Sequence, residues 1–324
     1  MATPPIFVQA AKKIWNCEWN VLMDRLAPSD SEGNYKRPQK LQQEIYIPNK
    51  EDLKKRDLNQ IPYLLVGQSC PWAHRAWMMH QIKGLESTIN LTIVEVNTSS
   101  GRWEFDPHFK GCKSLLELYK KCTSYQIKRA TLPMLFDPGE GLNSKFRLIN
   151  NESAELVEIL NRWPINTNNI DLNPSKYYKK IANWHNLIQE NINNGVYKCG
   201  FSRNQHAYEK ASDSLFATLA IIEESLRSNG PWLCGEALTI ADIRLFPTLI
   251  RWESIYEPLF KCSKKPIQSF PNIINWRKTL FNSYNIKNTC NADAWRKDYF
   301  GALFPLNPSS IIPKGQSISK IVND

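Results

Sequence analysis

The sequence predicts two structural units in a chain of 324 residues: an α/β domain over residues 61–163 and an all-helical domain over residues 174–290. Short apolar runs alternate with helical patterns in the first unit, whereas strand patterns vanish in the second. Residues 163–174 between them are rich in Asn and Pro, which is typical of a linker. We expect residues 1–60 to form an N-terminal extension and residues 291–324 an irregular C-terminal tail.

The first unit reads, in chain order, as strand, helix, strand, helix, strand, strand and helix. The segments with these patterns are 63–66, 72–82, 91–96, 113–122, 132–136, 146–149 and 153–160. Turn-forming residues at 137–141 favour a hairpin between the third and fourth strands. A parallel crossover unit followed by a hairpin and a covering helix is the order of the thioredoxin-like fold.

The second unit shows only helical patterns, separated by glycine and proline. They cover residues 174–194, 204–228, 239–257 and 271–283. Thr239 and Asp242 have the spacing of a capping box, in which each side chain satisfies a backbone N–H of the first turn. We therefore expect a helix to begin at Thr239.

Composition and charge argue against several classes of protein. The formal net charge is +10, but the basic residues are dispersed and form no block of five or six, so we expect no nucleic-acid partner. No apolar run approaches the roughly 18 residues that span a bilayer, and the first residues lack a secretory pattern, so we expect no membrane partner. Eight scattered cysteines indicate reduced thiols and a cytoplasmic location.

One cysteine, Cys70, lies at the junction between the first strand and the first helix. Pro71 suits the first helical position, because its ring presets φ and its missing N–H is not needed there. The unpaired N–H groups and the helix dipole then favour the thiolate of Cys70 and lower its pKa from the usual value of about 8.5. Arg75, one turn further on, is expected to add positive charge.

The residue three positions after Cys70 is Ala73, so no local cysteine can resolve a mixed disulfide. A second thiol must come from solution, and glutathione is the abundant cytosolic candidate. Two alternatives stand beside this interpretation. Cys70 could be a small buried residue, which is our interpretation of the other seven cysteines, or it could bind a metal together with His74. A single pair supplies too few ligands for zinc, and we expect no metal.

Two further segments favour a ligand that is peptide-like. In a thioredoxin-like fold the bond between Leu132 and Pro133 would be cis, leaving the backbone of Leu132 to pair with an extended peptide; the alternative is a trans proline that starts a strand. Glu152 and Ser153 open the last helix of the unit, where a helix N-terminus binds a carboxylate and Glu152 can hold an ammonium group. An ordinary helix cap explains these two residues equally well.

Six segments, taken together, resemble the glutathionyl-hydroquinone reductases, which are the Xi-class glutathione transferases. These segments are 70–75 (Cys-Pro-Trp-Ala-His-Arg), 101–105, 150–155, 194–198, 241–246 and 260–262. The resemblance runs in order from about residue 60 to 283 and continues more weakly at 307–308 and 312–313. It implies the glutathione transferase fold, with a thioredoxin-like N-terminal domain and an all-α C-terminal domain.

The resemblance also implies a reaction and a set of site residues. Cys70 would attack the glutathione sulfur of a glutathionyl-hydroquinone, release the hydroquinone and form a mixed disulfide, which a second glutathione then reduces. Glutathione would be the co-substrate, bound by a set of residues that comprises Trp103, Arg129, Leu132, Pro133, Glu152 and Ser153. Tyr197, Tyr256 and Tyr299 would line the quinol pocket and donate to the ring oxygens, although each could also be an ordinary packing residue.

The chain departs from the family pattern close to the expected quinol pocket. Leu259 replaces a histidine found in many members, Cys199 replaces alanine, and residues 299–303 differ from the usual tail motif. The nearest alternative function is an omega-like thioltransferase or dehydroascorbate reductase that uses the same cysteine. A non-catalytic interaction module with a transferase fold is a third possibility. Family resemblance further implies a homodimer assembled through the helical domain.

Overall fold

The computed structural model describes residues 4–36, 46–124, 127, 129–139 and 145–323. Its first domain contains a four-stranded sheet in the order β2-β1-β6-β7. The strands are β1 (Tyr63–Val66), β2 (Asn90–Ile93), β6 (Met134–Asp137) and β7 (Arg147–Asn150). All four residues of β1 and of β6 are buried, which explains why both strands read as continuous apolar runs.

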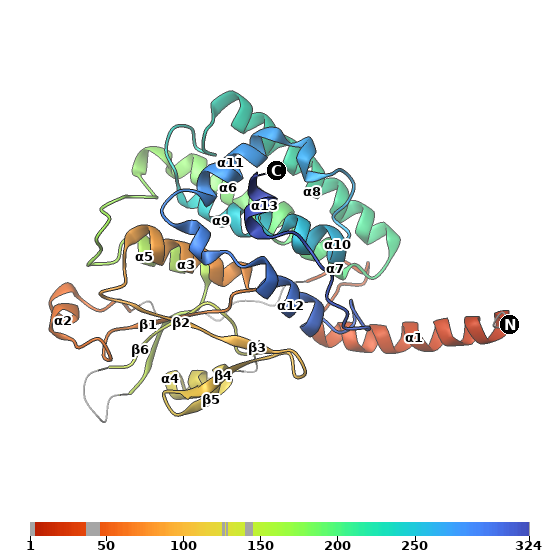
Figure 1. Cartoon of the computed structure of the whole chain (residues 1–324), viewed down its shortest axis with the longest axis horizontal. Helices are drawn as coiled ribbons and strands as arrows, with labels where there is room; N and C mark the ends of the chain where they lie inside the picture. Colours follow the sequence, from red (N-terminus) through yellow and green to blue (C-terminus); the bar gives the residue numbers. More distant parts are fainter. Residues whose placement is uncertain (1–3, 37–45, 125–126, 128, 140–144, 324) are drawn as a thin grey trace.

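The topology of this sheet confirms the thioredoxin-like prediction. β1 and β2 are parallel, with Leu64 opposite Leu91, and helix α3 (Pro71–Lys83) connects them. β6 pairs antiparallel with β1 and with β7. Helices α3 and α5 (Ser153–Asn161) cover the face of the sheet that is turned toward the helical domain (Figure 1). The sheet therefore presents the start of α3 at the junction of the two domains.

A second, three-stranded antiparallel sheet was not predicted. It consists of β3 (Glu95–Asn97), β4 (Arg102–Phe109) and β5 (Cys112–Ser114), and helix α4 (Leu115–Cys122) follows it directly. The predicted strand over residues 91–96 is in fact split between β2 and β3, one in each sheet. Pro107 within β4 removes a ladder hydrogen bond and hides the strand pattern in the sequence.

The second domain is helical, and its helices are interrupted where the sequence predicted continuous ones. Its elements are η1 (Ser175–Tyr177), α6 (Tyr178–Ile188), the π-helical turn η2 (Gln189–Asn193), α7 (Gly195–Phe201), α8 (Gln205–Asn229), α9 (Ile240–Leu249), the π-helical turn η3 (Trp252–Tyr256), α10 (Glu257–Phe260), η4 (Ile267–Ser269), α11 (Pro271–Phe281) and η5 (Ile286–Thr289). The predicted capping box is confirmed, because the carboxylate of Asp242 accepts the backbone N–H of Thr239 at 3.0 Å. A π-helical turn re-aims the side chains around it, and such turns are frequent at functional sites.

The C-terminal segment corrects one prediction. Instead of an irregular tail, it contains α12 (Ala292–Ala302) and the short helix α13 (Ile318–Asn323). Trp295 and Tyr299 are buried on α12, which packs against both η3 and β3. In Figure 1 α12 lies between the two domains. Pro305, Pro308 and Pro313, which are typical of irregular structure, all follow α12.

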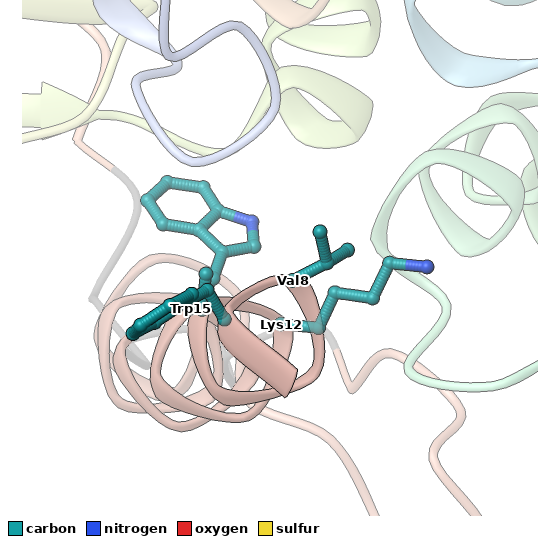
Figure 2. Close-up of a pocket in the computed structure, with 5 residues that line it drawn as sticks. Val8, Lys12 and Trp15 are labelled. Carbon is teal, nitrogen blue, oxygen red and sulfur yellow. The ribbon is translucent and has the colours of Figure 1, made fainter. Parts of the chain in front are cut away.

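The N-terminal extension contains α2 (Lys50–Lys55) and a long helix, α1 (Pro5–Leu26). The first half of α1 extends beyond the rest of the molecule (Figure 1). Its apolar side chains, including those of Val8 and Trp15, form an exposed surface (Figure 2). Across the residues that the structure describes, none of the helices has the length and apolarity needed to traverse a bilayer.

Candidate active site

Cys70 is the N-cap residue of α3, and Pro71 occupies the first position of the helix. The Sγ of Cys70 accepts a hydrogen bond from the backbone N–H of Ala73 at 3.5 Å, so an N–H of the first helical turn points at the sulfur, as predicted. The thiol donates to the carbonyl oxygen of Leu132, also at 3.5 Å. Cys70 is partly exposed, and none of the eight cysteines, all within the described residues, forms a disulfide. The N–H of Ala73 and the helix dipole act in favour of a thiolate, whereas the contact with Leu132 needs the protonated thiol.

Leu132 and Pro133 lie directly before β6, and the bond between them is cis, as predicted. Trp103 on β4 approaches the same place, because a Cβ added to Gly67 would lie 2.5 Å from its ring and 3.1 Å from Cδ1 of Leu132. Glycine at position 67 is therefore required for the close approach between the loop before α3 and these two side chains. These contacts bring Cys70, Leu132 and Trp103 close together.

Glu152 and Ser153 begin α5, as the sequence predicted. The carboxylate of Glu152 accepts the N–H of Ala154 at 3.3 Å, which is a helix-cap contact. The hydroxyl of buried Ser153 accepts from Nη1 of Arg75 at 3.3 Å. The guanidinium of Arg75, which was expected to add positive charge beside Cys70, contacts Ser153 and Gln189. It links α3 to α5 and to the helical domain.

Arg129 is exposed. Its predicted part in glutathione binding stays a prediction that rests on the family resemblance.

The three predicted tyrosines meet in one cluster, in which Tyr256 and Tyr299 are buried and Tyr197 is half-buried, although they come from three separate elements. The hydroxyl groups of Tyr197 on α7 and Tyr299 on α12 are 2.6 Å apart, and that of Tyr256 in η3 is 3.4 Å from Tyr299. Phe260 packs edge-on against Tyr197 and Tyr299. The hydroxyl of Tyr299 is the centre of this cluster.

Burial raises the pKa of all three tyrosines, and the effect is strong for Tyr197 and Tyr299. A smaller contribution to the raised pKa of Tyr197 and of Tyr256 comes from the charge of Cys70. The thiol is therefore close enough to the phenols for its charge to be felt by both. At neutral pH the cluster consists of protonated hydrogen-bond donors.

Sequence reasoning missed two residues that connect the thiol to this cluster. Trp72 stacks on Tyr197 with ring centroids 6.3 Å apart, and Cζ of Arg75 lies 4.5 Å from the centroid of the Trp72 ring. Arg251 donates to the carbonyl of Gln68, two residues before Cys70, at 2.9 Å. Trp72 was visible in the motif after Cys70, whereas no local pattern distinguishes Arg251 from a surface arginine.

The metal alternative has no support. His74 does not share a site with Cys70, because its two ring nitrogens are 2.8 Å from Nη1 of Arg251 and 2.7 Å from Oγ1 of Thr289. Within the described part of the chain, no group of three His, Cys, Asp or Glu side chains could hold a metal ion. The site has the chemistry of a single thiol with neutral phenols.

A thiol at a helix start, opposite a cis-proline strand and joined to an all-helical domain, defines the class of glutathione-dependent thiol enzymes. Residues 69–163 match the family described as "Glutathione S-transferase, N-terminal domain" and residues 205–279 the family "Glutathione S-transferase, C-terminal domain". The chain belongs to the glutathione S-transferase family and has its fold.

Named relatives place the chain among the Xi-class members of this family. It is 35% identical to the glutathionyl-hydroquinone reductase PcpF of Sphingobium chlorophenolicum, with 78% of this chain and 82% of the relative covered. It is 33% identical to the glutathionyl-hydroquinone reductase YqjG of Escherichia coli, with 78% of each chain covered. The crystal structure of glutathione-S-transferase Xi from Phanerochaete chrysosporium is similar with a TM-score of 0.78 and 31% identity, over 89% of this chain and 94% of that one.

A relative has been solved with glutathione bound. The glutathione-bound structure of YqjG from Escherichia coli K-12 matches with a TM-score of 0.71 and 32% identity, over 79% of this chain and 85% of that one. Glutathione is the co-substrate of this enzyme.

Proposed function

We propose that this protein reduces glutathionyl-hydroquinones to hydroquinones, with Cys70 as the catalytic nucleophile. One observation carries the proposal: a single thiol contacts the cis-proline segment and is close to the tyrosine cluster. The Cys70 thiol contacts Leu132, its charge acts on Tyr197 and Tyr256, and the neighbouring Trp72 stacks on Tyr197. The relatives named glutathionyl-hydroquinone reductase support the same conclusion.

The reaction has two half-reactions. In the first, the Cys70 thiolate attacks the sulfur that joins glutathione to the quinol ring. The new sulfur–sulfur bond forms as the carbon–sulfur bond breaks, and the ring takes the electron pair and one proton to become the hydroquinone. In the second, the thiolate of another glutathione attacks the Cys70–glutathione disulfide, restores the Cys70 thiolate and leaves as glutathione disulfide.

Each group of site residues has its own part in this scheme. Trp103, Leu132, Pro133, Glu152 and Ser153 hold glutathione, with the start of α5 receiving its γ-glutamyl end. Arg129 belongs to the same set on the strength of family resemblance alone. Tyr197, Tyr256 and Tyr299 face the quinol and donate protons or hydrogen bonds to it, because their raised pKa keeps them protonated at neutral pH.

A comparison of two cysteine variants tests the proposal. Cys70→Ala should lower turnover of glutathionyl-menadiol by about 10³-fold or more, because the nucleophile is gone. Cys17→Ala is the matched control, since Cys17 is exposed on α1 and outside the site. After mixing with glutathione disulfide, mass spectrometry should find one glutathione adduct, on Cys70. Full turnover by Cys70→Ala would refute the assignment.

Relatives named "Glutathione S-transferase omega-like 2", one of them 32% identical, favour a thioltransferase or dehydroascorbate reductase as the second candidate. Rates on dehydroascorbate, a small disulfide and a glutathionyl-hydroquinone, measured side by side, separate the two functions. A Cys70 that reacts with iodoacetamide at pH 6 no faster than free cysteine would indicate a non-catalytic module instead.

Two further properties belong to the same proposal. A reaction that consumes reduced glutathione suits a cytoplasmic location. The family resemblance also supports a homodimer assembled through the helical domain, which sedimentation or light scattering would test directly.

A further inference from the structure

Arg251 carries a buried positive charge that no carboxylate neutralises. Its side chain is fully buried at the start of η3. In the described part of the chain the buried Arg56, Arg244 and Arg277 each pair with a carboxylate, at 2.7, 3.0 and 2.8 Å, whereas no ion pair includes Arg251. Burying an uncompensated charge costs several kcal/mol in general, so its retention calls for a physical reason.

The contacts of Arg251 fix its guanidinium beside the active site. Nη1 donates to the carbonyl of Pro247 at 2.9 Å and lies 2.8 Å from Nδ1 of His74, while Nη2 donates to the carbonyl of Gln68 at 2.9 Å. The guanidinium lies 4.2 Å from the centroid of the Trp295 ring. All the partners are neutral, and Nε, which is buried, has no hydrogen-bond partner.

The elements that hold Arg251 also carry two of the three tyrosines. Arg251 directly precedes the π-helical turn η3, which ends at Tyr256, so the two residues share one wide helical turn. Trp295, against which Arg251 stacks, is four residues before Tyr299 on α12, and residues at this spacing lie on the same helix face. Arg251 is therefore linked to the tyrosine cluster twice, through η3 to Tyr256 and through Trp295 on α12 to Tyr299.

The charge of Arg251 acts on titratable groups that include His74, Cys290, Tyr256 and Tyr299, and these four are neutral at pH 7 before the reaction. Burial lowers the pKa of His74 well below its ordinary value, and Arg251 lowers it further. Burial raises the pKa of Cys290 to about 12, and it raises that of Tyr256 and Tyr299, while Arg251 acts in the opposite direction on all three. The positive charge of Arg251 would therefore stabilise an anion that forms on the tyrosine cluster.

The proposed reaction creates such an anion. When the quinol ring takes a proton from the cluster in the first half-reaction, a buried phenolate remains until solvent returns the proton. We propose that Arg251 stabilises the transient negative charge on the cluster of Tyr197, Tyr256 and Tyr299. This inference rests on the proposed function.

The two half-reactions separate this role from a structural one. The first needs a proton from the cluster, whereas the second exchanges a disulfide for a thiolate and needs none. Arg251→Gln should slow quinol release in a single turnover by at least about tenfold, a smaller effect than the roughly 10²-fold or greater loss that follows removal of a donor in direct contact with a developing charge. The reduction of the Cys70–glutathione disulfide by glutathione should change by less than about twofold.

Two further variants complete the experiment. Arg251→Lys keeps the positive charge but loses the planar guanidinium with its several N–H donors, and it should slow quinol release less than Arg251→Gln does. Arg277→Gln removes a different buried arginine and should leave the ratio of the two rates at the wild-type value. If Arg251→Gln does not fold, Arg251→Lys is judged by the same ratio. Equal slowing of both half-reactions, or an unchanged rate of quinol release, would overturn the inference.

These outcomes differ from a failure of the proposed function. If the protein did not act on glutathionyl-hydroquinones, wild type would show no quinol release at all. A wild-type protein that releases quinol, together with an Arg251→Gln variant whose half-reactions keep their wild-type ratio, would leave the function standing and remove only the role of Arg251.

Discussion

His74 is buried in α3, and its ring nitrogens are held by Arg251 and Thr289. Because Nη1 of Arg251 can only donate, Nδ1 accepts and Nε2 carries the proton that is donated to Thr289. Burial keeps the pKa of His74 well below its usual 6.5, so the folded protein holds it neutral. A neutral imidazole there explains how Arg251 can lie beside it, since two adjacent cations would repel.

The same ring makes stability depend on pH. Below about pH 6.5 the unfolded chain binds a proton at His74 that the folded chain does not bind. The contribution of His74 to stability therefore falls as pH falls below that value and is constant above it. His74→Gln should remove about 1 kcal/mol per pH unit from this slope between pH 6.5 and 5, measured by urea unfolding. Exposed His206→Gln is the control. An unchanged slope in His74→Gln would mean that His74 is protonated in the folded state.

At the scale of elements, α9 depends on a buried carboxylate at its start. Asp242 is fully buried and accepts from the backbone of Leu233 and Thr239 and from the indole of Trp276, each at 2.9–3.0 Å. Burial raises its pKa although these hydrogen bonds act against the rise. The carboxylate thus joins the helix cap to a preceding loop and to α11, which explains why one residue can hold three segments together.

Asp242→Ala should therefore lower the free energy of unfolding by about 2–4 kcal/mol, since it leaves several buried donors unsatisfied. Asp242→Asn should cost less, because its amide oxygen still accepts two of the hydrogen bonds. Asn49→Ala, at the exposed cap of α2, is the comparison and should cost about 1 kcal/mol or less. Equal losses at Asp242 and Asn49 in urea unfolding would show that the buried network adds nothing beyond an ordinary cap.

At the scale of the whole molecule, the sequence predicted what local signals determine. The start of α3 follows from Cys70 and Pro71, and the capping box of α9 from Thr239 and Asp242, because each motif acts within one helical turn. The sheet β3-β4-β5 was missed since Pro107 breaks the strand pattern of β4. Its existence is decided by pairing between strands rather than by local preference.

The candidate site shows the same division. Cys70 and Leu132 were predictable from their own surroundings, whereas the meeting of Tyr197, Tyr256 and Tyr299 was expected only from family resemblance. Three elements far apart in the chain bring these hydroxyl groups together, and α12 was predicted to be irregular. The burial of Arg251 without a carboxylate partner among the described residues was not predictable, because no local sequence pattern shows which side chains will surround a residue in the folded chain.

Helix α1 divides into an exposed half and an anchored half, and this division leads to a last prediction. Every described residue from 4 to 18 is exposed, whereas Met23 is fully buried and Arg203 binds Asp24 at 2.9 Å. A variant that begins at Trp19 should change the free energy of unfolding by less than about 0.5 kcal/mol, because it removes no buried contact. It should also keep wild-type turnover, since no site residue is lost.

Met23→Ala is the matched comparison in the anchored half. Deleting a buried methionine side chain should lower the free energy of unfolding by about 2–5 kcal/mol, because a cavity is left in the core. Thermal and urea unfolding of both variants measure the contrast. A truncated protein that is as unstable as Met23→Ala would show that the exposed apolar face of Val8 and Trp15 is covered in solution, and light scattering would then reveal whether a second copy covers it.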